Sequence, residues 1–320
     1  MASTKTGTDS TTTLTDSTKT GIWLFPGLGC RYVGMGHDII GRFPVADKLI
    51  EQAQSQLGYS IADVCLEGSG RKHVSSRHEA QVIYVIECAY AAVLEDLGFK
   101  PRAVSGHSLG TLAAACVCGG YDFLTGLKLV TQIEVLQEEL VDGRGQAMGV
   151  IIGLSESVVQ ALVTADSEVY LANWNSPGQY VIGGTVGGVE GVLGAAMRQG
   201  AKQSKRLPGE RAMHTPRMFE LADRLRSHLA GLEFCTPHVP FISSQDASVV
   251  QTADQLRDFL GAFLAFPVRW DATVAALKQG WGAAFVEVGP GNVLSNMMPF
   301  IDRTARILSA SDLLDQKTAL

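Results

Sequence analysis

Apolar and polar positions along the chain follow patterns that predict strands and helices in turn. The run "GIWLF" at 21–25 is apolar and closes at Pro26 and Gly27, which predicts a buried strand that delivers a glycine-rich loop. Between 79 and 99 apolar residues recur at helical spacing up to a glycine, which predicts a buried helix. The segment "PRAVSGHSLGTLAAACVCGG" at 101–120 then predicts a short strand, a tight turn and a helix of small residues.

The pattern changes near Gly149, where short apolar runs and helical stretches follow in the order β-α-β-β-α-β. This order is typical of ferredoxin-like modules, so we expect an inserted small domain at 147–212. The larger domain is then discontinuous and consists of 21–146 and 213–320. Residues 1–20 are rich in Ser and Thr and lack an apolar core, so we expect a disordered leader and not a signal peptide.

Composition limits the classes of function. With 320 residues, of which 46% are hydrophobic, the chain can bury a large core. A net charge of -6 argues against a nucleic-acid surface, because phosphate binding needs clustered Lys and Arg. The six cysteines have no metal-ligand spacing, and no apolar stretch is long and uncharged enough to span a membrane. We therefore expect a cytoplasmic protein, without a metal, whose partners are small molecules or proteins.

The motif "GHSLG" at 106–110 carries the strongest chemical signal. It fits Gly-x-Ser-x-Gly, the nucleophile elbow, in which a sharp strand-to-helix turn holds a serine exposed in strained backbone. Ser108 is the nucleophile that this pattern predicts. The helix that begins after it directs N–H groups and its positive dipole end at the site, so Leu109 N–H is the natural first donor to an oxyanion.

A serine nucleophile needs a base, and the chain has seven histidines as candidates. His107 neighbours Ser108, but adjacent elbow residues point in different directions, so we expect it to pack beside the site. Most of the others lie in charged or proline-flanked surroundings. His214, in "ERAMHTPRM", remains as a candidate that the residues alone do not single out.

Seven motifs taken together resemble a known family. They are "FPGLGCRYVGMG", "GHSLG", "AMGVIIGL", "ANWNSPGQYVIGG", "RAMHTPRM", "FPVRW" and "VEVGPGNVLSNM". Their order and approximate spacing are similar to those of the malonyl-CoA:acyl-carrier-protein transacylase family, which includes the acyltransferases of polyketide assembly lines. The resemblance covers roughly residues 21 to 310.

The resemblance implies an α/β fold, with an α/β-hydrolase-like core, an inserted ferredoxin-like small domain and an active site in the cleft between them. It also implies that Ser108 accepts the acyl group and that His214 is its general base. The acyl group would arrive as a thioester of coenzyme A or of the phosphopantetheine arm of an acyl carrier protein. No other cofactor is implied.

The family's supporting residues map onto four further positions. The oxyanion hole would be formed by the backbone N–H groups of Leu28 and Leu109, although the family usually has glutamine at the position of Leu28. The backbone carbonyl of Phe263 would orient the base. Asn292 would support this arrangement. An asparagine at this position is equally well explained as a turn residue whose side chain bonds its own backbone.

The sequence departs from the family at Ile133. Malonyl-specific members carry an arginine there, whose guanidinium forks onto the malonyl carboxylate. An aliphatic residue suits an acyl chain without that carboxylate, and we expect Ile133, Met213 and His107 to line the acyl pocket. Three other arginines flank the site motifs and could replace the missing one: Arg31, Arg211 and Arg217.

These features leave several hypotheses open. The first is an acyltransferase that moves a non-malonyl acyl group, of polyketide or aminoacyl type, to an acyl carrier protein in polyketide-type biosynthesis. The alternatives are an acyl hydrolase that clears carriers, a malonyl transacylase despite Ile133, and a carrier-binding scaffold without catalysis. An acidic carrier protein is expected to dock near the cleft through Arg206, Arg211, Arg217 and Arg306. The alternative is that these four are ordinary surface arginines in contact with solvent.

Overall fold

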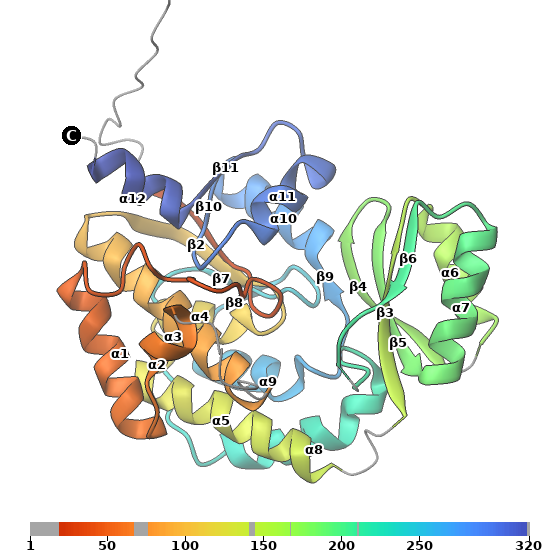
Figure 1. The fold of residues 1–320 in the computed structure, drawn as a ribbon, viewed down its shortest axis with the longest axis horizontal. Coiled ribbons are helices and arrows are strands. Elements are labelled where there is room, and N and C mark those ends of the chain that lie inside the picture. The colour runs from red at the N-terminus through yellow and green to blue at the C-terminus, as the bar shows by residue number, and fades with distance from the viewer. Residues whose placement is uncertain (1–18, 67–75, 141–144, 167, 210, 319–320) are drawn as a thin grey trace, which may run out of the picture.

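The computed structural model describes residues 19–66, 76–140, 145–166, 168–209 and 211–318, with backbone only at 76–77 and 316–318. Figure 1 shows a large sheet surrounded by helices and, beside it, a smaller sheet with two helices on its outer side. The fold class expected from the sequence, an α/β-hydrolase-like core with a ferredoxin-like insertion, is confirmed. The expected leader lies outside the described residues except for its last two positions.

The large sheet has the strand order β11-β10-β1-β2-β7-β8. Its neighbouring strands pair in parallel, apart from the antiparallel pair of β7 and β8. The strands are β1 (Thr20–Phe25), β2 (Lys100–Gly106), β7 (Phe241–Ile242), β8 (Val249–Val250), β10 (Ala284–Glu287) and β11 (Arg306–Ser309). The central strands β1 and β2 end beside each other, with Phe25 opposite Gly106, so the loops that follow them meet at one edge of the sheet.

The continuous apolar run of β1 reflects burial on both faces of the large sheet. Trp23 and Phe25 belong to the core cluster with α3 and α4, whereas Ile22 and Leu24 belong to the cluster with α10 and α11. The helices of this part are α1 (Pro44–Leu57), α2 (Ile61–Leu66), α3 (Ser76–Asp96), α4 (Gly110–Val117), α5 (Phe123–Glu139), α8 (Phe219–Leu229), α9 (Ala253–Ala262), α10 (Trp270–Trp281), α11 (Val293–Ile301) and α12 (Ala310–Thr318), with a short 3-10 turn at Pro216–Met218. No described helix is long and apolar enough to cross a membrane.

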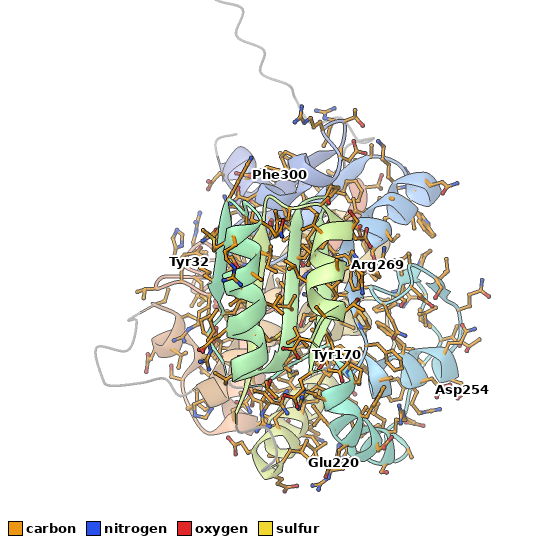
Figure 2. All side chains as sticks on the ribbon, turned by 90° about the vertical axis from the view of Figure 1, so that its right-hand side faces the viewer. Tyr32, Tyr170, Glu220, Asp254, Arg269 and Phe300 are labelled. Carbon is orange, nitrogen blue, oxygen red and sulfur yellow. The ribbon has the colours of Figure 1, made fainter. Side chains whose placement is uncertain are left out.

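The small sheet contains the expected β-α-β-β-α-β order. Its elements are β3 (Gln146–Ile152), α6 (Glu156–Thr164), β4 (Val169–Ser176), β5 (Gln179–Thr185), α7 (Val186–Arg198) and β6 (Gln203–Arg206). Helices α6 and α7 cover the side of the sheet away from the large sheet, and they stand in front of it in Figure 2.

One strand of the small sheet comes from outside the inserted segment. Strand β9 (Val268–Arg269) pairs in parallel with β4, which gives the order β6-β3-β5-β4-β9. The Arg269 guanidinium lies over the Trp174 ring at 4.6 Å from its centroid, a cation–π contact that reinforces the pairing. The segment "FPVRW" therefore joins the small sheet to the larger part of the chain.

Candidate active site

The turn between β2 and α4 has the geometry of a nucleophile elbow. Ser108 has a φ of 54°, in the left-handed region that a side chain other than glycine rarely adopts. A Cβ on Gly106 would lie 2.1 Å from Thr111 N, and one on Gly110 would lie 2.2 Å from Phe25 O. Both flanking positions therefore require glycine, and the turn holds Ser108 in a strained conformation next to the end of β1.

The structure brings His214 to this serine from 106 residues further along the chain. Ser108 Oγ and His214 Nε2 are 2.7 Å apart, which is a hydrogen bond. His214 also has a left-handed backbone, with a φ of 61°, and its N–H donates to Leu264 O at 2.7 Å. The imidazole is almost fully buried, whereas Ser108 is half-buried and thus reachable from outside.

Backbone carbonyls orient the imidazole of His214. Its Nδ1 lies 3.0 Å from Phe263 O and 3.3 Å from Phe266 O, so Nδ1 carries the proton and donates to them. Nε2 is then free to accept the Ser108 proton. The geometry agrees with the expected role of the Phe263 carbonyl. The contact with the Phe266 carbonyl is an addition that the sequence does not predict, because the letters "FPVRW" do not indicate the direction of a backbone carbonyl.

The surroundings keep His214 neutral. Burial lowers the pKa of His214, and the charge that a protonated His107 would carry lowers it as well. The contacts with the Phe263 and Phe266 carbonyls oppose this shift only in part, so the pKa lies at about 4. An imidazole that is uncharged at pH 7 is available as a proton acceptor.

The glycine-rich loop after β1 packs directly against the elbow. A Cβ on Gly27 would lie 2.5 Å from Gly110 N and 2.6 Å from His107 O, so only glycine allows this approach. Among the described residues, neither Leu28 N–H nor Leu109 N–H donates a hydrogen bond to another protein group. Two unpaired donors thus flank Ser108 on adjoining loops, as an oxyanion hole requires.

The expectation that Asn292 helps to orient the base finds no support in the contacts. Asn292 is exposed at the start of α11, and its Oδ1 accepts from Asn296 Nδ2 at 3.1 Å. The orienting contacts on His214 come from Phe263 and Phe266 instead. Asn292 stands at the N-terminal end of α11 without a side-chain capping bond, and among the described residues its side chain bonds only that of Asn296.

His107 packs beside the site, as the sequence indicated. Its Nε2–H donates to Asn175 Oδ1 at 2.9 Å, and its ring meets the edge of Trp270 at 5.2 Å between centroids. Burial lowers the pKa of His107, and the Asn175 contact partly opposes that shift. His107 therefore links the elbow to β4 of the small sheet and to α10.

Ile133 is buried on α5, with 5% of its surface exposed. It belongs to the same apolar cluster as Leu109, and Met213 packs against that cluster from the side of the base. The position at which the family resemblance led us to expect an arginine is therefore occupied by a buried apolar side chain.

The four arginines expected to form one docking surface do not lie together. Arg306 is on β11, one of the two edge strands of the large sheet, whereas Arg206 is on β6, an edge strand of the small sheet. Figure 1 places β11 at the top of the view and α8, just after Arg217, at the bottom. The expectation of a single patch of all four arginines is wrong, because β11 and α8 lie at opposite ends of the view.

Two of these arginines pair with carboxylates, and a third bonds a carbonyl. Arg206 lies 3.8 Å from Glu190, and Arg217 lies 3.4 Å from Glu168. Arg211 donates to Leu140 O at 3.2 Å. Arg217 and Arg211 thus already have partners, so either would have to leave its partner to bind a malonyl carboxylate.

Comparison with known proteins shows the family of this chain. Residues 22–306 match the acyl transferase domain family. The chain belongs to this family. A malonyl CoA-acyl carrier protein transacylase from Synechocystis sp. is 34% identical to this acyl transferase over 275 residues, which cover 86% of this chain and 91% of that protein. The resemblance noted in the sequence is confirmed.

Solved structures place this acyl transferase among the same relatives. An acyl carrier protein S-malonyltransferase from Vibrio cholerae has a TM-score of 0.85 and 30% identity, covering 91% of this chain and 96% of that one. A malonyl-transacylase in complex with its type II polyketide synthase acyl-carrier protein has a TM-score of 0.88 and 31% identity, covering 93% of this chain and 98% of that one.

A further relative by sequence is the polyketide biosynthesis protein ThaF from Burkholderia thailandensis. It is 30% identical over 279 residues, which are 86% of this chain and 24% of ThaF.

Proposed function

We propose that the protein transfers a non-malonyl acyl group from an acyl thioester, through an ester on Ser108, to the phosphopantetheine thiol of an acyl carrier protein. The observation that carries this proposal is the hydrogen bond between Ser108 Oγ and a neutral, carbonyl-oriented His214. Membership of the acyl transferase family supports acyl transfer as the reaction. Relatives named for acyl carrier proteins support the carrier as acceptor.

The first half-reaction follows from the geometry. His214 Nε2 takes the Ser108 hydroxyl proton while Oγ attacks the thioester carbonyl. The resulting oxyanion accepts hydrogen bonds from Leu28 N–H and Leu109 N–H. The C–S bond then breaks, the departing thiol takes the proton from Nε2, and an acyl ester remains on Ser108.

The second half-reaction reverses these steps with a different thiol. The carrier's phosphopantetheine thiol gives its proton to His214 and attacks the seryl ester. Ser108 Oγ leaves and recovers the proton. The kinetics are then ping-pong, and the same residues act in both directions.

The apolar setting of Ile133 supports a substrate without a terminal carboxylate. A carboxylate buried without a partner costs several kcal/mol, whereas charge-assisted hydrogen bonds contribute about 1.5–3 kcal/mol each. Ile133 is buried in an apolar cluster and offers malonyl no donor, and Arg211 and Arg217 already pair with Leu140 O and Glu168, so a malonyl carboxylate would have to rely on Arg31. A polyketide or aminoacyl-type chain fits this setting better.

The test is to incubate the protein with a simple acyl thioester and to measure its intact mass before and after peptide mapping. The proposal expects one acyl adduct, located on Ser108 and absent from Ser108→Ala. An adduct that persists in Ser108→Ala would contradict the role of Ser108. Malonyl-CoA in a parallel reaction should label the protein more slowly than the simple acyl thioester, and equal labelling would contradict the non-malonyl specificity.

A further inference from the structure

A buried carboxyl group lies directly beneath the glycine-rich loop. Glu87, in the middle of α3, is fully buried, and its Oε1 accepts the Gly27 N–H at 2.7 Å. Its other oxygen, Oε2, is buried without a hydrogen-bond partner among the described residues. A fully buried carboxyl group with one oxygen unpaired is costly, so its presence calls for a role beyond packing.

The sequence contains a signal for this residue. Glu87 stands four positions after Ile83 and three before Tyr90, on the apolar face that predicts the buried side of the helix. An acid at such a position is expected inside the fold. Only the structure tells which group it reaches.

The contact to Gly27 acts on the oxyanion hole. Gly27 is fixed from both sides, since its N–H is held by Glu87 and its Cα lies against the elbow at Gly110. Leu28, which offers the unpaired N–H, is the next residue. Any shift at Gly27 therefore moves that donor relative to Ser108.

We propose that Glu87 is a positioning residue, whose uncharged carboxyl group holds the Gly27 N–H and so keeps the Leu28 N–H aimed at the oxyanion formed on Ser108. This inference rests on the proposed acyl transfer. It adds a requirement that Glu87 be protonated, because a carboxylate beneath the loop would oppose the negative charge that develops in the transition state.

The surroundings favour the uncharged form. Burial raises the pKa of Glu87, the Gly27 contact partly opposes this shift, and the nearby Glu287 adds to it, so that the pKa lies at about 8. Glu287 is on β10, and its two carboxyl oxygens accept hydrogen bonds from Leu294 N–H and Ser295 N–H of α11. Among the residues that the structure describes, the thiols of Cys30 and Cys88 also interact with Glu87, and burial raises the pKa of both.

The experiment compares the pH profiles of the wild type and Glu87→Gln. The rate of Ser108 acylation is followed with p-nitrophenyl butyrate from pH 6 to 10, and Ser108→Ala supplies the background hydrolysis. The acylation rate of the wild type should fall roughly 10-fold per pH unit above the pH at which half of Glu87 is ionised. Glu87→Gln, whose amide oxygen still accepts from Gly27 but never ionises, should match the wild type near pH 7 and lack the alkaline loss.

Two further variants separate positioning from stability. Glu87→Leu removes the acceptor and should acylate at least 10-fold more slowly than Glu87→Gln at every pH, with its fold checked by circular dichroism. Glu287→Gln removes a buried carboxyl that does not touch the loop, so the alkaline loss should persist and move to lower pH.

The result that overturns the inference is an unchanged alkaline loss in Glu87→Gln, or equal acylation rates in folded Glu87→Leu and Glu87→Gln. A failure of the proposed function differs from both, because the wild type would then form no ester at any pH.

Discussion

The close approach of Gly27 to the elbow gives a quantitative prediction. In Gly27→Ala the new Cβ lies 2.5 Å from Gly110 N, and ordinary contact begins at 3.4 Å, so the two loops must separate by about 0.9 Å. A displacement of about 1 Å in a catalytic group can cost roughly 100-fold in rate, and loss of an oxyanion donor costs about 10²–10³-fold. We therefore expect kcat/KM to fall by at least about 100-fold.

Gly29 of the same loop provides the matched control. Gly29 also has a positive φ, of 97°, but a Cβ placed there meets no atom within 4 Å. Both alanine variants bear the strain of a left-handed residue, on the order of 1–2 kcal/mol, and only Gly27→Ala separates the loops. The assay is kcat/KM for acyl transfer, measured alongside thermal stability. If folded Gly27→Ala and Gly29→Ala have kcat/KM values within threefold of each other, the reasoning is refuted.

Three further predictions concern the base and the pocket. His214→Ala should slow acylation and transfer by roughly 10²–10⁴-fold, and near-normal rates would reassign the base. Because the pKa of His214 is lowered to about 4, the acid loss of kcat/KM should begin well below pH 6.5, whereas a midpoint near 6.5 would contradict the buried, neutral imidazole. Ile133→Arg should raise the malonyl-to-acyl ratio of kcat/KM relative to Ile133→Met, a neutral control of similar size, and an unchanged ratio would remove Ile133 from the acyl pocket.

The pKa shift of His214 also has a consequence for stability. The folded state resists protonation down to about pH 4, whereas an unfolded histidine gains its proton near 6.5. The unfolded state therefore binds more protons between these values, and the free energy of unfolding should decrease as pH falls through this window. Glu87 has the opposite effect on the free energy of unfolding. Because its pKa is raised from 4.5 to about 8 in the folded state, the free energy of unfolding should decrease as pH rises through this window.

The parts of the site that the residue pattern predicted without the family resemblance are local in the chain. The elbow around Ser108 depends on glycines two residues away on either side, and the small domain on a regular alternation of strands and helices. What the sequence did not reveal depends on long-range packing. The Phe266 carbonyl on His214, the pairing of β9 with β4, and the contact of Glu87 with Gly27 all join segments dozens of residues apart.

The wrong predictions have the same origin. Asn292 could cap a turn or reach the base, and only the position of α11 decides between them. Arg206 and Arg306 were grouped by charge, although they lie on the outer strands of two different sheets. Residue type alone does not tell which face of the molecule a side chain occupies.

The most direct test of acyl transfer uses two carrier proteins of different mass. One carrier is loaded with a labelled unbranched acyl group, the other carries a free phosphopantetheine thiol, and intact masses of both are followed after the protein is added. The account predicts that the label moves to the second carrier, that Ser108→Ala abolishes the movement, and that a malonyl group moves more slowly. Release of the label as free acid, with no gain on the second carrier, would contradict transfer and identify a hydrolase.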